Sequence, residues 1–353
     1  MSEMESDRRE GAPHPRDTQT LIGHEAQERA FLDAYASGRF PHAWILAGAE
    51  GVGKATFAYR AAAFVLTHPD PLAPAVQNAP SLDVAESSKA LHLIRAESHP
   101  DLLVLKRRWH ADRKRLETEI PVDHARDVVG FFGSTAGSGG WRVLIVDAGD
   151  DLNRNSANAL LKLIEEPPPR CLVMIVSHVP ERLIPTIRSR CRLMQFRPLN
   201  EDQVVAALEE AEADATPEAI RQAASFAEGS PGRAFRFVDD MALAIMSAVR
   251  AQLDALPVLD RLALHQMADG LAGRQNDESY ALFEDVLAGW IHEQLVRAGR
   301  SGTAPARLAP LIEVWDKARA SMRDAEIFNL DRRALILTLF ADLSDAVRAT
   351  RAA

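Results

Sequence analysis

The sequence predicts an α/β domain with a parallel sheet, followed by a second half made of helices. Short apolar segments of strand length alternate with segments of helical periodicity up to about residue 197, and no strand signal follows. Alternation of this kind is typical of parallel sheets whose faces are covered by helices. A glycine-rich segment at 48–54, between the first strand and the next helix, adds a phosphate-binding motif to this fold class.

The individual strands and helices are expected from local periodicity. Helical spacing at 25–35 precedes a short apolar run at 42–47 that ends before a glycine, as a buried parallel strand does. The helix at 156–165 ends because three prolines follow it. The remaining strands are expected at 101–105, 142–147, 172–176 and 193–196, and the remaining helices of this domain at 54–66 and 122–132.

The chain is expected to form three domains behind a polar N-terminal segment. Its 353 residues exceed what one compact core usually holds. Residues 1–20 contain no apolar run, so we interpret them as a mobile tail and not as a secretory signal. The α/β domain is expected at 21–197, a small helical domain at 198–240 and a larger helical domain at 241–353.

Charge and cysteine content argue against several classes of protein. A net charge of -9 argues against a chain that binds nucleic acid on its own, because such proteins usually carry a strongly basic face. No apolar run approaches the roughly 18 residues that span a membrane. The two cysteines, Cys171 and Cys191, lie in segments expected to be buried, which favours reduced thiols in a cytoplasmic protein.

The segment at 48–54 fits the G-x-x-x-x-G-K motif of phosphate loops. Its glycines let backbone N–H groups curve around phosphates, and Lys54 adds a positive charge at the start of a helix whose dipole also favours anions. A loop that retains only the shape of a nucleotide site, and binds weakly or not at all, is the alternative. The candidate nucleotide-binding residues here are Gly48, Glu50, Gly51, Val52, Gly53, Lys54, Ala55 and Thr56.

Two positions that ATP hydrolysis needs are occupied by alanine. Ala55 stands where a hydroxyl normally ligates Mg²⁺, and Thr56 is rotated away by about 100° along the helix. Asp147 ends the apolar strand and would face the Mg²⁺ shell, but Ala148 replaces the glutamate that orients the attacking water. We therefore expect little or no ATP hydrolysis by this chain. The residues leave open whether ATP and Mg²⁺ bind.

A set of short segments occurs in an order that is found in a known family. They are Leu21–His24, His99–Asp101, Asn158–Pro168, Pro185–Cys191, Gly229–Arg233 and, more loosely, Asn329–Arg332. Together they resemble bacterial clamp-loader subunits of the AAA+ class, and most nearly the delta-prime branch of the DNA polymerase III clamp-loader family. The resemblance implies an AAA+ phosphate-loop domain, a helical lid at 198–240 and a helical collar at 241–353 that holds an oligomer together.

The resemblance assigns roles to three polar residues. Arg190 would act as an arginine finger in trans, because a guanidinium near the γ-phosphate of a neighbour's ATP offsets the charge that grows in phosphoryl transfer. Ser177, at the end of a strand, matches sensor 1, and Arg233 matches the sensor 2 position that contacts the subunit's own nucleotide. Structural interpretations remain open for each: an arginine that caps carbonyls or pairs with an acid, a strand-end cap and a helix-start arginine.

The resemblance implies a delta-prime-type subunit that completes the AAA+ ring and helps to load the sliding clamp on primed DNA. The implied partners are gamma/tau-type and delta-type subunits, the sliding clamp, and primed DNA through the assembled complex, without a membrane. Nucleotidyltransferase activity would belong to the DNA polymerase III holoenzyme and not to this chain. An active gamma/tau-type motor subunit is the alternative, opposed by Ala55 and Ala148, and a stand-alone phosphate-loop kinase is a third.

One departure from the family concerns zinc. Many delta-prime relatives carry a four-cysteine zinc site between the phosphate-loop helix and the next strand, whereas residues 67–100 contain no cysteine here. We therefore expect no zinc. The basic run at 106–115 is interpreted as a solvated hairpin, with contact to DNA phosphates as the alternative.

Overall fold

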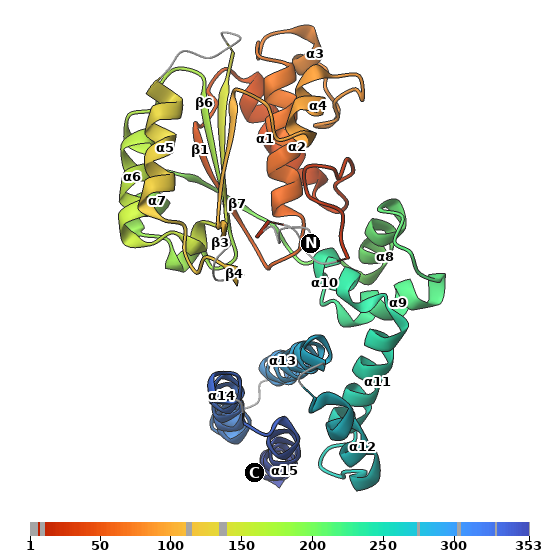
Figure 1. The fold of residues 1–353 in the computed structure, drawn as a ribbon. Helices are drawn as coiled ribbons and strands as arrows, with labels where there is room; N and C mark the ends of the chain where they lie inside the picture. Colours follow the sequence, from red (N-terminus) through yellow and green to blue (C-terminus); the bar gives the residue numbers. More distant parts are fainter. Residues whose placement is uncertain are drawn as a thin grey trace. The chain divides into compact units, whose positions relative to one another are not determined.

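Five parallel strands form the sheet in the first part of the chain (Figure 1). Their order is β2-β5-β6-β1-β7, and each neighbouring pair is parallel. This computed structural model confirms the α/β fold class that the sequence predicts. The strands are β1 Ala43–Ala47, β2 Leu102–Lys106, β5 Arg142–Asp147, β6 Cys171–Ser177 and β7 Arg192–Gln195.

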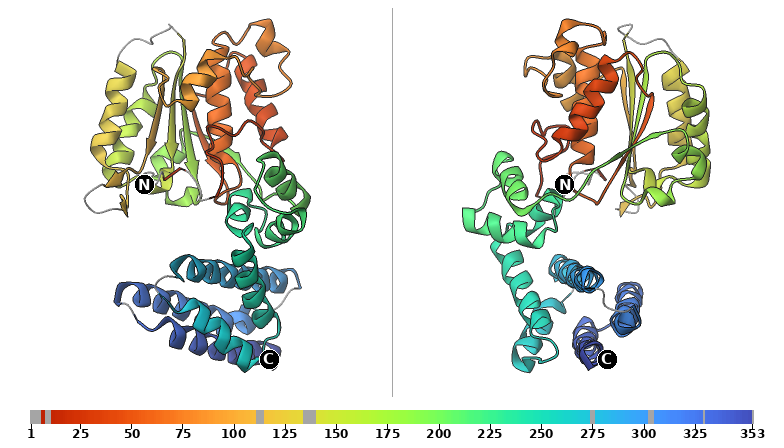
Figure 2. Two further views of the ribbon diagram at one scale, coloured as in Figure 1. Left: turned by 45° about the vertical axis from the view of Figure 1, so that its right-hand side comes forward. Right: turned by 180° about the vertical axis from the view of Figure 1, so that it is seen from behind.

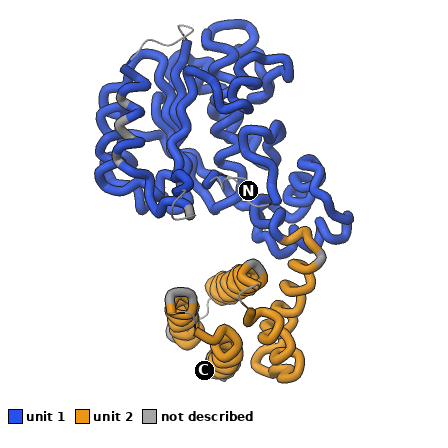
Figure 3. Tube along the Cα trace, in the orientation of Figure 1, with its two compact units in different colours: residues 1–236 blue, residues 237–353 orange. Residues whose placement is uncertain are grey.

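The chain divides into two compact units, residues 1–236 and 237–353 (Figure 3). The first contains the sheet and helices α1 to α10, and the second contains α11 to α15. The expected division into a lid and a collar after residue 240 stays a prediction, and residue 240 begins α11. The structure describes residues 6–7, 11–110, 115–133, 140–273, 276–301, 305–328 and 330–352.

Helices cover both faces of the sheet (Figure 2). Successive strand residues point to opposite faces, so Trp44 and Leu46 of β1 join the core beneath α1 and α2, whereas Ala43 and Ile45 join the core beneath α5 and α6. β1, β5 and β6 are therefore buried along their whole length. One face carries α1 Glu25–Ala36, α2 Lys54–Thr67, α3 Pro74–Gln77 and α4 Lys89–Arg95, and the other carries α5 Val122–Gly133, α6 Arg154–Glu165 and α7 Pro185–Arg188.

The first unit continues after the sheet with α8 Glu201–Glu210, α9 Pro217–Phe226 and α10 Pro231–Ala234. α8 begins with a capping box, in which Asn200 and Gln203 each accept a hydrogen bond from the other's backbone N–H. α9 begins with Thr216 as its N-cap and a proline at its first position. Both starts follow the rule that Asn, Thr and an initial proline favour the first turn of a helix.

The second unit consists of helices packed on one another. Its elements are α11 Asp240–Asp254, α12 Arg261–Leu271, α13 Asp277–Arg300, α14 Pro305–Phe328 and α15 Arg332–Ala352. Phe283 and Phe340 are fully buried with ring centroids 6.4 Å apart, so α13 and α15 share a core. Within the described residues, no helix is both long and apolar enough to cross a membrane.

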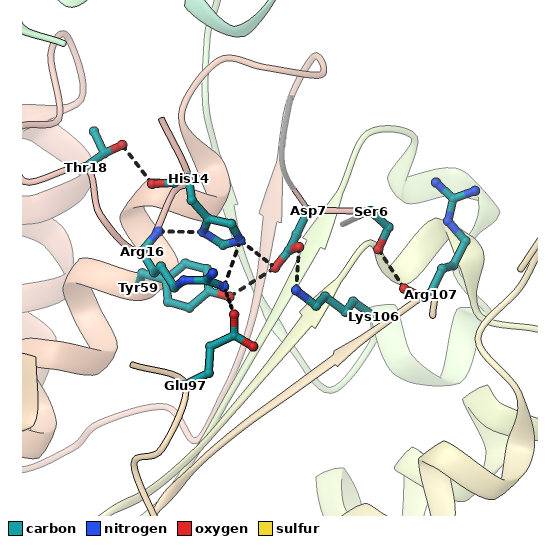
Figure 4. A network of polar contacts seen from close by, with 9 residues as sticks. All are labelled: Ser6, Asp7, His14, Arg16, Thr18, Tyr59, Glu97, Lys106 and Arg107. Carbon is teal, nitrogen blue, oxygen red and sulfur yellow. Dashed lines mark hydrogen bonds and ion pairs between the residues drawn. The ribbon is translucent and has the colours of Figure 1, made fainter. Parts of the chain in front are cut away.

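The described part of the N-terminal segment, residues 6–7 and 11–20, contains buried residues, whereas the sequence predicts a mobile tail. Asp7 and His14 are buried against the first unit, and Asp7 forms an ion pair with Lys106 at the end of β2 (Figure 4). The sequence predicts a mobile segment because a polar segment lacks an apolar run that could form a core. Here, charged hydrogen bonds to residues far along the chain hold the described part of the segment in place.

The basic run after β2 has acidic partners at its start. Lys106 pairs with Asp7, and Arg107 pairs with Asp151. The expected hairpin is present as the antiparallel strands β3 Trp109–His110 and β4 Arg115–Leu116, while 111–114 lie outside the described residues. Contact between this run and DNA stays an untested alternative.

Candidate functional site

The phosphate loop connects β1 to α2, and its backbone requires glycine. Gly51 has a φ of +76°, and a Cβ atom added there would lie 2.4 Å from Ser230 Oγ. Gly53 has a φ of +107° and forms the N-cap of α2. Only glycine adopts such angles without strain, so Gly51 and Gly53 permit the loop conformation that the motif predicts.

Lys54 is buried at the start of α2 and folds back onto the loop. Its Nζ donates hydrogen bonds to Gly48 O at 2.8 Å and Ala49 O at 2.6 Å. The Lys54 ammonium group is thus held against the backbone of the loop, next to the space where a phosphate group would bind.

A cavity of about 590 Å³ adjoins this loop. It is lined by the N-terminal segment, the phosphate loop, the ends of β5 and β6, and residues of α8 and α10, and its size is within the range of small-molecule sites. Gly48, Ser177 and Arg233 lie outside its described lining. The predicted nucleotide-binding residues that line it are Glu50, Gly51, Val52, Gly53, Lys54, Ala55, Thr56 and Asp147.

Asp147 reaches the cavity from the carboxyl end of β5. Burial, with the nearby negative charge of Asp7, raises the pKa of Asp147 to about 7. Asp147 is the one carboxylate at this strand end, an oxygen donor of the kind that Mg²⁺ prefers. Ala55, in the same lining, adds no oxygen atom. The residues present therefore do not fit a Mg²⁺ site of the hydrolysing kind.

Ser177 ends β6 with its hydroxyl bound to an acid. Ser177 Oγ donates to Asp150 Oδ1 at 2.9 Å, and the backbone N–H groups of His178 and Val179 donate to the same carboxylate at 2.6 and 3.1 Å. Asp150 therefore caps the carboxyl end of the neighbouring strand β6. Its place directly after β5, beside β6 in the sheet, is the signal that could have revealed it. The sensor 1 role of Ser177 stays a prediction.

Helix α10 is tied directly to the phosphate loop. Ser230 Oγ donates to Glu50 O at 2.8 Å, and the backbone N–H of Gly232 donates to Gly51 O at 3.0 Å. Sequence reasoning singled out Arg233 in this helix and gave Ser230 and Gly232 no contact with the loop. Arg233 pairs with Glu228 at 2.7 Å, and its sensor 2 role stays a prediction.

Arg190 lies at the opposite edge of the sheet from the phosphate loop. It comes just before β7, whose Arg192 pairs with Trp44 near the start of β1, whereas the loop follows the end of β1. Its side chain is 43% exposed and pairs with Glu165 at 3.0 Å. It also donates to Thr186 O and Ser189 Oγ. The guanidinium is thus held at the surface, away from the cavity of its own chain.

The described residues contain no group of three or more His, Cys, Asp or Glu side chains that could hold a metal ion. Burial raises the pKa of both cysteine thiols, Cys171 and Cys191, to about 12. Both are free cysteines, and as protonated thiols they would be weak metal ligands. The prediction that the chain contains no zinc remains untested.

Comparison with known proteins identifies the family. The family model described as "DNA polymerase III, delta subunit" matches residues 23–200, just over half of the 353-residue chain. Subunit delta' of Pseudomonas aeruginosa DNA polymerase III is 37% identical over 193 residues, 54% of this chain and 53% of that protein. Subunit delta' of Escherichia coli is 31% identical over 201 residues, 57% of this chain and 55% of that protein. Subunit tau of Escherichia coli is 26% identical over 223 residues, 62% of this chain and 32% of that protein.

The chain spans about half the length of the delta' relatives that it matches. A solved structure of a DNA polymerase III gamma subunit-related protein from Thermotoga maritima aligns with 89% of this chain, and 99% of its own, at 17% identity and a TM-score of 0.38. The family match and the delta' relatives confirm the resemblance inferred from the short sequence segments. The chain belongs to the DNA polymerase III delta-prime family of clamp-loader subunits.

Proposed function

We propose that this chain is the delta-prime subunit of a clamp loader and completes the AAA+ ring that loads the sliding clamp on primed DNA. Its neighbours would be gamma/tau-type and delta-type subunits, and it would meet the clamp and DNA through the assembled complex, in the cytoplasm. Membership of the family and similarity to delta' and tau subunits support this proposal. Nucleotidyltransferase activity would belong to the holoenzyme.

The position of Arg190 is the observation that carries the proposal. Its guanidinium is partly exposed at the edge of the sheet opposite the phosphate loop. The five residues of β1 that separate the two edges span about 16 Å, so this arginine is poorly placed for its own pocket. A neighbouring subunit could receive it, and a fixed guanidinium there would stabilise the charge of the transferring phosphoryl group.

The pocket of this chain is, in our proposal, a weak or inactive nucleotide site. Ala55 supplies no hydroxyl for Mg²⁺, and Ala148 supplies no base for water. ATP hydrolysis by the isolated chain should stay at background. Turnover comparable to that of a motor subunit, abolished by Lys54→Ala, would favour the gamma/tau-type alternative.

The test of the proposal is Arg190→Ala in a clamp loader reconstituted with its partner subunits. An arginine finger contributes about 10³–10⁵-fold at a single site, but a loader has several sites, so total ATPase should fall only partly. Clamp loading should fall further than total ATPase does if loading requires ATP hydrolysis at that one site. Arg190→Lys should rescue poorly, because an ammonium lacks the planar pair of donors.

Melting temperature, complex yield and ATPase are measured on the same preparations. Arg221→Ala is the matched control, since Arg221 is an exposed arginine paired with Glu218 on α9 and should leave all three unchanged. A structural role for Arg190 gives a different result: a lower melting temperature and poor assembly, with normal ATPase per assembled complex. That result would refute the proposal that Arg190 acts as an arginine finger in a neighbouring subunit.

A further inference from the structure

Acceptors from two different helices hold the guanidinium of Arg190. Its Nη1 donates to Thr186 O at 3.2 Å and to Ser189 Oγ at 3.3 Å, and both acceptors belong to the turn of α7 just before it. Its Nη2 lies 3.0 Å from Glu165 Oε1, at the end of α6. Glu165 thus reaches the guanidinium from outside the segment that carries Arg190.

Glu165 occupies a helix position that does not favour an acid. It is the last residue of α6, and the C-terminal end of a helix is the negative end of the helix dipole. A carboxylate there is disfavoured unless a cation balances it, and Arg190 provides a cation at ion-pair distance. The ion pair therefore offsets an unfavourable charge that α6 would otherwise carry at its end.

The two helices that hold Arg190 are fixed on one core. Leu163 and Ile164 of α6 and Ile187 of α7 belong to the same buried cluster on one face of the sheet. In addition, His42 Nε2 lies 2.8 Å from Ile164 O, which joins the end of α6 to the residue before β1. Glu165 is therefore carried by a fixed helix end, whereas Arg190 has a long side chain with several rotatable bonds.

The exposure of the ion pair decides what Glu165 does for Arg190. The two side chains are 43% and 44% exposed, so water screens their attraction, and pairs of this kind are weak. Such a pair does not keep the guanidinium from a phosphate group with several negative charges. It does narrow the conformations of the arginine before that phosphate arrives, and less rotamer freedom is then lost when the guanidinium meets it.

We propose that Glu165 is a positioning residue for Arg190, which it holds in the orientation that meets the nucleotide of the neighbouring subunit. The inference rests on the proposed function, because it requires Arg190 to act in trans. Glu165 itself touches no nucleotide and acts only through the guanidinium. The group that the pair serves is the triphosphate of a nucleotide bound to the adjacent chain.

The test is a double-mutant cycle in the clamp loader reconstituted with its partner subunits. The Arg190-dependent rate is the ATPase kcat of the parent minus that of Arg190→Ala. Glu165→Ala should lower this rate by up to about fivefold and leave KM for ATP unchanged, because the guanidinium acts on the transition state. In the Arg190→Ala background, the same substitution should have no further effect. Glu165→Gln keeps an oxygen acceptor in place and should retain more of the rate than Glu165→Ala does.

Glu166→Ala is the matched control. Glu166 follows Glu165 at the same helix end and is also exposed, so its substitution removes the same charge one residue beyond the ion pair. The Arg190-dependent rate should stay unchanged in this variant. Alanine is the residue that favours a helix most, so neither substitution should unfold α6.

A second readout follows Arg190 directly in the isolated full chain. Phenylglyoxal modifies accessible guanidinium groups, and mass spectrometry of peptides gives the rate of modification at each arginine. Glu165→Ala should speed the modification of Arg190, because one of its acceptors is gone. Arg188, at the end of α7, is the internal reference and should react at the same rate in both proteins.

The possible outcomes separate this proposal from the proposed function. An Arg190-dependent rate that Glu165→Ala does not lower, or an unchanged modification rate of Arg190, overturns the positioning role and leaves the arginine finger intact. A loss that persists in the Arg190→Ala background also overturns it, because Glu165 would then act by another route. If Arg190→Ala leaves ATP hydrolysis unchanged, the arginine finger is refuted and the positioning role with it.

Discussion

His24 links two segments of the site through one buried ring. Its Nε2 lies 2.7 Å from Val52 O in the phosphate loop, and its ring packs edge-on against Phe196 with centroids 4.8 Å apart. Burial lowers the pKa of His24 below its ordinary value of 6.5, although the hydrogen bond to Val52 opposes this effect. The neutral imidazole, donating to the loop carbonyl, is therefore the form that the folded chain favours.

This pKa shift predicts a loss of stability in acid. Because the folded state disfavours the proton, the unfolded chain binds more protons below about pH 6.5, and stability falls as pH falls through that region. His24→Gln should flatten the fall of melting temperature between about pH 7.5 and about pH 5. Burial also lowers the pKa of His68 and His99, so part of the slope should remain. An unchanged dependence of melting temperature on pH in the variant would show that His24 does not contribute to the loss of stability in acid.

At the scale of elements, the direction of the strands places the site. The carboxyl ends of parallel strands meet at one edge of a sheet, where ligands bind in open α/β folds. The phosphate loop after β1, Asp147 at the end of β5 and Ser177 at the end of β6 meet there for this reason. Arg190 precedes β7 and is left at the other edge. The parallel direction of the strands therefore places the chain's own pocket at one edge of the sheet. It places Arg190, which we propose acts in a neighbouring subunit, at the other edge.

The cap that joins β5 to β6 gives a prediction at this scale. Asp150→Ala would leave Ser177 Oγ and the N–H groups of His178 and Val179 without their acceptor, at a cost of about 1–3 kcal/mol in the free energy of unfolding. Urea denaturation of the full chain measures this cost. Asp33→Ala, which removes an exposed carboxylate paired with Arg29 on α1, should change stability by no more than about 1 kcal/mol. Equal effects of the two substitutions would argue against the cap.

At the scale of the whole molecule, the two compact units suggest two separate functions. The sheet, the cavity and Arg190 belong to the first unit, and the second is a set of helices with its own core. The family resemblance makes the helical part a collar that holds the oligomer together. The collar role of the second unit remains a prediction.

Truncation after Arg236 tests this division. The shortened chain should keep its folded sheet, because both cores that cover the sheet lie within residues 1–236. It should no longer co-purify with partner subunits, whereas residues 237–353 alone should do so. Circular dichroism and co-purification measure the two properties. Normal assembly of the truncated chain would contradict the collar assignment.

The sequence by itself determined the local features of this protein. Strand and helix periodicity, the glycine-rich loop and the alanines at positions 55 and 148 are all properties of neighbouring residues. Periodicity predicted the α/β fold, which the sheet confirms, whereas the poor hydrolysis expected from the two alanines stays a prediction. The short segments that resemble clamp-loader subunits are local as well, and the comparisons confirmed the family from them.

Only the tertiary structure decided which distant residues share the site. Asp7 meets Lys106 across 99 positions of sequence, Ser230 meets Glu50 across 180, and Asp150 caps a strand 27 positions away. No periodicity encodes such pairs, because an ion pair or a hydrogen bond forms only when the fold brings both partners together. For this reason a segment interpreted from sequence as a mobile tail lies, in the folded chain, against the pocket.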